Sequence, residues 1–202
     1  MKNPVLRVLV ALLGIAVVIL GIRQLQGAGG MPTREEAREL AATAANSLTG
    51  YTNQQRGITL QYPSGWSREE PKDGPLFFGF KTLAGVVNAN VLSQDVAAGT
   101  MLFEYVDRNV AETEAALKQQ NAQPRTLSRD KCVIGGEPGM VIRYAFLTPA
   151  EDKADPPLAV QVSQAFVLHG NRAYAITWTT PEQWHEDFAA LFAKVLDTVR
   201  FL

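Results

Sequence analysis

The sequence predicts an α+β domain in which a central antiparallel sheet of six or seven strands lies between two long covering helices, as an αβα layered sandwich. Most of the expected strands follow one another through short connections, such as residues 135–139 and 169–171. Parallel strands would need a crossover helix for each pair, and only two long helical patterns interrupt the strands. About 150 residues follow residue 50, which is a common size for one hydrophobic core.

An uncharged apolar run at residues 8–22 precedes this domain, with Lys2 and Arg7 before it and Arg23 after it. Such a run near the N-terminus predicts membrane targeting. Residues 1–23 are either a transmembrane anchor, which would enter the membrane through residues 4–22, or a signal peptide cleaved near residue 29. The basic residues before the run outnumber Arg23, which predicts an extracytoplasmic domain. We expect a single-pass protein of the inner or plasma membrane with a periplasmic domain, or an exported soluble form after cleavage.

Residues 24–50 are predicted to link the apolar run to the domain. A Gly-rich stretch is followed by Thr33 and Glu36, whose spacing is that of a capping box at the start of a helix. The helix should continue to about Asn46. Its charged residues and alanines leave little besides Leu40 for a core, so we interpret it as a solvated spacer, with a frayed tether as the alternative.

The first half of the domain, from residue 51, contains three expected strands and a helix. Residues 56–62 alternate between apolar and polar side chains, and residues 63–66 turn the chain. Residues 76–83 and 86–93 are expected to pair as a hairpin around residues 84–85. Apolar side chains at helical spacing between residues 100 and 120 predict an amphipathic helix.

The second half contains four expected strands and the closing helix. Residues 126–134 and 140–148 should pair around the Gly-rich turn, and residues 158–168 should pair with 172–180. The polar residues 149–157 are expected to form an exposed loop. Pro181 in the first turn, with Thr180 as the cap, predicts the start of the closing helix. Its expected buried stripe is Trp184, Phe188, Leu191, Val195 and Val199.

Residues 57–66, Gly-Ile-Thr-Leu-Gln-Tyr-Pro-Ser-Gly-Trp, resemble the opening strand of the PsbP-like superfamily, which includes the PsbP, Mog and DcrB-like proteins. The turn at residues 136–139, the strand at 173–177 and a closing helix ending in Phe201 follow in the same order. The resemblance covers residues 51–202 and implies an αβα sandwich with an accessory, assembly or binding role. Several membrane-attached relatives carry a lipoprotein-type cysteine, which is missing here, so the apolar run would supply the attachment.

Charge and cysteine content argue against nucleic-acid binding and against an internal disulfide. The chain carries 19 Lys and Arg against 20 Asp and Glu, so no basic surface for nucleic acid is expected. Cys132 is the one cysteine, which excludes an internal disulfide. Its place in a predicted strand indicates a small buried side chain, and an intermolecular bridge is the alternative.

No arrangement of residues predicts catalysis, so we expect neither enzyme activity nor a cofactor. Glu182 and His185 are three residues apart on the predicted closing helix and Glu186 adds a carboxylate, which makes them candidate metal ligands. The alternative is a solvated first turn whose acids stabilise the helix dipole. Trp66 is a candidate for lining a ligand groove, with a place in the core as the alternative. His169 is expected to be an ordinary turn residue.

Together these features predict a membrane-tethered, non-enzymatic binding or assembly module that holds a protein partner at the membrane. Two alternatives stay open: a metal- or small-ligand-binding domain centred on the start of the closing helix, and a chaperone for transmembrane segments.

Overall fold

The computed structural model of the chain describes residues 32–70, 76–80, 86–147 and 157–202. The apolar run at residues 8–22 lies outside the described residues, as do the expected hairpin connection at 84–85 and most of the expected loop at 149–157. In the described ranges, no helix combines the length and the apolar character that crossing a membrane requires.

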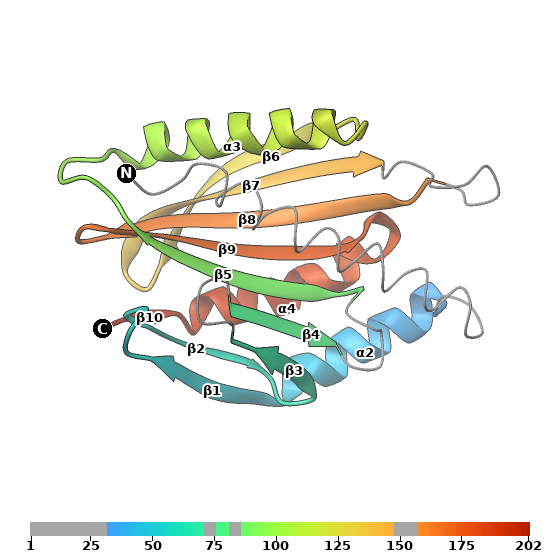
Figure 1. Ribbon diagram of the computed structural model, residues 1–202. Helices are drawn as coiled ribbons and strands as arrows, with labels where there is room; N and C mark the ends of the chain where they lie inside the picture. Colours follow the sequence, from blue (N-terminus) through green and yellow to red (C-terminus); the bar gives the residue numbers. More distant parts are fainter. Residues whose placement is uncertain (1–31, 71–75, 81–85, 148–156) are drawn as a thin grey trace.

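Seven antiparallel strands form one large sheet, which confirms the predicted sheet (Figure 1). Their order across the sheet is β3-β4-β5-β9-β8-β7-β6, so β3 and β6 lie at its two edges. The strands are β3 (Trp66–Glu69), β4 (Leu76–Phe80), β5 (Asn88–Asp95), β6 (Arg125–Ile134), β7 (Glu137–Leu147), β8 (Ala159–His169) and β9 (Arg172–Pro181). The predicted hairpins therefore all pair within this sheet.

A second sheet of three strands was not predicted. In it, β2 (Ile58–Pro63) lies between β1 (Leu48–Asn53) and β10 (Arg200–Phe201). The apolar face predicted for β2 is confirmed, since Ile58 and Leu60 are buried. Its pairing with β10 joins the start of the domain to its end.

Two helices lie on opposite faces of the large sheet. These two helices are α3 (Leu102–Gln119) and α4 (His185–Asp197), and the third described helix is α2 (Arg34–Asn46). Phe166 on β8 packs against Tyr105 of α3, with ring centroids 6.0 Å apart, whereas Trp178 on β9 packs 5.4 Å from Phe192 of α4. Trp178 is paired with Ser163, which is three residues from Phe166 on β8, so the two aromatic rings point to opposite faces. We call these the α3 face and the α4 face.

The helix α2 begins and ends as predicted, but it is not a solvated spacer. The Thr33 hydroxyl accepts a hydrogen bond from the Glu36 amide, and the Glu36 carboxylate accepts one from the Thr33 amide, as a capping box requires. However, Ala37, Ala41 and Ala44 are buried and α2 packs along α4. Small side chains let two helices approach closely, so α2 is part of the packed domain.

The closing helix begins later than predicted. β9 continues to Pro181, a short 3-10 turn η2 (Glu182–Trp184) follows, and α4 begins at His185. Thr180 belongs to the strand and is not a helix cap. The predicted buried stripe is nevertheless confirmed, with Trp184, Phe188, Leu191, Val195 and Val199 all buried.

The turn between β6 and β7 is shorter than predicted. Gly135 and Gly136 have φ values of 59° and 88°, so they form a two-residue turn in which both residues are left-handed. Ile134 is paired with Glu137 directly beside the turn, and Pro138 already belongs to β7. A β-carbon at residue 135 would lie 2.8 Å from the Phe201 ring, so this turn also needs glycine for close packing.

Candidate functional site

The structure does not bring the three candidate metal ligands together. His185 turns into the core and is 3% exposed, whereas Glu182 lies at the surface with its carboxylate 3.6 Å from Arg125. Glu186 is also exposed. Among the residues that the structure describes, no three His, Cys, Asp or Glu side chains form a group that could hold a metal ion.

His185 instead links the start of α4 to the sheet. Its Nε2 lies 3.0 Å from the Ser163 hydroxyl on β8, and its Nδ1 lies 3.0 Å from the Thr180 hydroxyl on β9. A neutral ring satisfies both contacts, since one nitrogen donates and the other accepts. Burial lowers the pKa of His185, and Arg143 acts in the same direction, whereas Glu186 opposes them. The neutral imidazole is thus a buried polar link between α4 and two strands.

Trp66 lies in the core rather than in a loop. It is the first residue of β3 and is 4% exposed, with its ring centroid 5.0 Å from that of Trp178. Trp178 in turn packs against α4. The ring of Trp66 therefore extends the aromatic packing of the α4 face toward the β3 edge.

His169 and Cys132 have structural surroundings. His169 ends β8 instead of lying in the turn; its Nδ1 is 2.9 Å from Glu137 Oε1 and its ring stacks on Phe201. Cys132 is half-buried on β6, and burial raises the pKa of its thiol, as does the charge of Asp130. A raised thiol pKa keeps the sulfur protonated and unreactive near neutral pH.

The long β6 edge is a feature that sequence reasoning did not find. β6 is 10 residues long and lies at the end of the strand order, whereas β3 at the other edge has 4 residues. No described strand pairs with the outer side of β6. A strand at a sheet edge can pair with a strand from another chain.

The turn before β7 defines which backbone groups of β6 face outward. Ile134 and Glu137 flank a two-residue turn and form the first hydrogen-bonded pair, after which hydrogen-bonded and non-hydrogen-bonded pairs alternate. Pro138, which has no N–H, falls in the second, non-hydrogen-bonded pair. The amides and carbonyls that point away from β7 are those of Arg129, Lys131 and Val133.

Exposed apolar side chains flank this row of backbone groups. Val133 is 70% exposed, and Phe103 near the start of α3 is 49% exposed. Asp107, one turn after Phe103, pairs with Arg129 of β6, so Phe103 lies on the side of α3 that is directed toward β6. We call Phe103, Arg129, Lys131 and Val133 the β6 edge surface.

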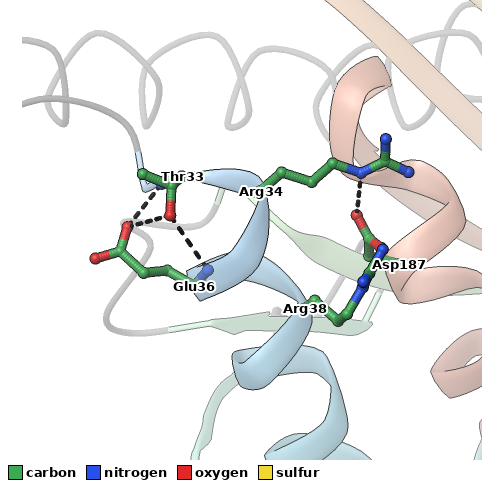
Figure 2. Close-up of polar contacts among 5 residues, drawn as sticks. All are labelled: Thr33, Arg34, Glu36, Arg38 and Asp187. Carbon is green, nitrogen blue, oxygen red and sulfur yellow. Dashed lines mark hydrogen bonds and ion pairs between the residues drawn. The ribbon is translucent and has the colours of Figure 1, made fainter.

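A second polar arrangement attaches α2 to α4 (Figure 2). The Asp187 carboxylate accepts hydrogen bonds from Arg34 Nε and Arg38 Nε, each at 3.1 Å. Burial raises the pKa of Asp187, but the hydrogen bonds and charges of the two guanidinium groups outweigh it and hold the pKa below its usual value. At the other end of α2, the Lys194 ammonium donates to the Ala45 carbonyl. We call Arg34, Arg38, Asp187 and Lys194 the α2 clasp.

Comparison with known proteins identifies the fold. No family model matches the sequence, and no curated protein matches it. The solution structure of the PsbP protein (CyanoP) from Synechocystis sp. PCC 6803 matches with a TM-score of 0.60 and 16% identity, over 77% of this chain and 93% of that one. The Ran-binding protein Mog1p of Saccharomyces cerevisiae matches with a TM-score of 0.54 and 14% identity, over 77% of this chain and 95% of that one. At these identities the likeness establishes the fold alone: the chain has the PsbP/Mog1-like fold, which confirms the predicted resemblance.

Proposed function

We propose that this protein is a membrane-tethered, non-enzymatic binding module that holds a partner protein on the extracytoplasmic side of the membrane. The apolar run at residues 8–22 and its basic neighbours support the membrane attachment. The fold supports the binding role, because the similar protein Mog1p is itself Ran-binding. The β6 edge surface is the observation that carries the proposal.

The β6 edge surface suits an extended segment of a partner. Such a segment would hydrogen bond with the outward amides and carbonyls of Arg129, Lys131 and Val133. These backbone hydrogen bonds would form with a segment of any sequence. Side chains at every second position of the segment would lie on the α3 face, beside Phe103 and Val133, and these contacts would select apolar residues.

A second copy of the chain is a poorer occupant than a different protein. If two β6 strands paired antiparallel about Asp130, that residue would face its own copy and Arg129 would face Lys131. If they paired about Lys131, two ammonium groups would face each other. Like charges directly opposite each other destabilise a strand pair, so the charges of β6 favour a partner of another sequence.

Site-specific photo-crosslinking in intact membranes tests the binding surface. A photoreactive residue at Lys131 should yield a discrete crosslinked product with a protein, whereas one at the exposed Lys118 of α3 should not. In a second arm, the crosslinker is placed at Val133 and Lys131→Pro removes one outward amide while leaving the hydrogen bonds to β7. This variant should lose the product and keep its thermal transition. Equal products from residues 131 and 118 would contradict the proposal.

Fractionation tests the membrane attachment separately. The full chain should remain with membranes through an alkaline wash, and a chain lacking residues 4–22 should not. In right-side-out inner-membrane vesicles, whose orientation is measured with a known marker, added protease should digest the domain. Protection of the domain in these vesicles would contradict its extracytoplasmic position. Release of the full chain by the alkaline wash would contradict the tether directly.

A further inference from the structure

We infer that the α2 clasp determines which end of the domain faces the membrane. The end that carries Thr33, η2 and the start of α4 is the membrane-proximal end, and the end that carries the β8–β9 turn and the C-terminus lies away from the bilayer. This inference rests on the proposed membrane attachment and specifies the surface that meets the lipid.

The helix α2 is packed firmly onto the domain. Ala37, Ala41 and Ala44 are buried between α2 and the rest of the structure. Arg34 and Arg38 both bond to Asp187 near the start of α4, and the Asp187 side chain is only 5% exposed. Lys194 holds the far end of α2. A helix fixed at both ends cannot act as a pivot between the domain and the membrane.

Only a short length of chain lies between the apolar run and α2. Residues 24–32 are nine residues between Arg23 and Thr33. Fully extended, nine residues reach at most about 30 Å. Thr33 would therefore lie within about 30 Å of the membrane surface. A free spacer helix would have added about 20 Å and a second pivot.

Thr33 lies near one end of the strands of the large sheet. The start of α2 contacts the start of α4 through Asp187, and only the short turn η2 separates α4 from the end of β9. β9 has 10 residues, so its other end, at Arg172, is about 30 Å away. In Figure 1 the C-terminus lies at the opposite side of the molecule from the start of α2. Thr33 thus lies near the end of the sheet at which β9 finishes, away from the β8–β9 turn.

Depth-dependent quenching of the full chain in lipid vesicles tests this orientation. In a Cys132→Ser background, a fluorophore is attached at Gln183→Cys in η2 or at Asn171→Cys in the β8–β9 turn, both of which are exposed. Vesicles with a quencher on the lipid headgroups should quench the label at residue 183 at least twofold more than the label at 171. Equal or reversed quenching in a chain that floats with the vesicles would overturn the inference. A chain that does not float would overturn the proposed attachment, and the inference with it.

Release of the clasp distinguishes its role from that of the tether alone. The double variant Ala37→Leu with Asp187→Ala should detach α2, so the difference in quenching between residues 183 and 171 should shrink. Asp107→Ala removes an exposed ion pair with Arg129 and is the matched control, which should preserve the difference. Circular dichroism checks that each variant keeps its sheet. An unchanged difference in a variant whose α2 is shown by protease cleavage to be released would overturn the inference.

Discussion

The two faces of the large sheet are covered to different depths. On the α4 face, His185 links α4 to two strands, and α2 packs along α4 as a second layer. On the α3 face, α3 leaves Phe103 exposed beside the open edge of β6. The α4 face therefore carries an additional packed layer that includes the helix α2, whereas the α3 face leaves apolar surface exposed.

The largest expected contrast between the two faces comes from one aromatic residue on each covering helix. Phe188 of α4 is fully buried, so Phe188→Ala should lower the free energy of unfolding by about 3–5 kcal/mol, because it leaves a cavity. The exposed Phe103 of α3 is the control, and Phe103→Ala should cost less than about 1 kcal/mol. Urea denaturation measures both values. If the two variants lost similar amounts of unfolding free energy, the two helices would be packed equally well and the contrast between the faces would be wrong.

The packing of α2 gives the next largest effect. Ala37 has no exposed surface, so Ala37→Leu should destabilise the domain by about 1–3 kcal/mol through overpacking. Glu39 lies on the exposed side of the same helix, and Glu39→Leu should change stability by less than about 0.5 kcal/mol. The midpoint of thermal unfolding should fall in Ala37→Leu and stay close to that of the wild type in Glu39→Leu. If both variants melt with the wild type, α2 is not part of the second layer.

Acidification should weaken the α4 face through His185. Because the pKa of His185 is lower in the folded state than its ordinary value of 6.5, the unfolded chain binds the proton more readily. The contribution of the neutral His185 to the free energy of unfolding is complete above about pH 6.5. It is lost as the pH falls from there toward the lowered pKa, and the free energy of unfolding then decreases by at most about 1.4 kcal/mol per pH unit. Denaturation between pH 7.5 and 5 measures this slope, which should disappear in His185→Gln. A slope that persists in the variant would assign it to another group.

The smallest expected effect concerns the clasp. Asp187→Asn should lower stability by about 1 kcal/mol, because both partner arginines are largely exposed and exposed ion pairs contribute little. The loss should shrink in 1 M salt, which screens the same contacts. Asp107→Asn, in an ion pair with both side chains exposed, should cost still less. Equal losses of stability in the two variants would show that the ion pairs of Asp187 stabilise the domain no more than the exposed pair of Asp107.

Elements with strong local periodicity could be predicted from the sequence. The amphipathic helix expected at residues 100–120 is α3 (Leu102–Gln119), and the two hairpins of the second half pair as expected. The two-residue strand β10 carries no such periodicity. The docking of α2 was missed because alanine adds little hydrophobicity, although Ala37, Ala41 and Ala44 follow helical spacing and mark one face.

The candidate site was harder to predict than the fold. His185 and Glu182 were expected on one helix face, but the helix begins at His185 and its ring meets Ser163, 22 residues away in the sequence. Such tertiary contacts leave no local pattern. The open edge of β6 depends on the order of strands across the sheet, which hairpin signals alone do not specify, since they show which strands pair but not where the sheet ends.

The pairing of β2 with β10 also constrains how the domain matures. Ile58 pairs with Phe201, and the Leu202 amide donates to the Gly57 carbonyl. These contacts join residues that are separated by nearly the whole domain, and pairings of such large sequence separation slow folding. The three-stranded sheet can therefore close only after residues 200–202 have been synthesised and are free to pair with β2. A chain that lacks residues 200–202 would leave one side of β2 unpaired, so these residues complete the three-stranded sheet.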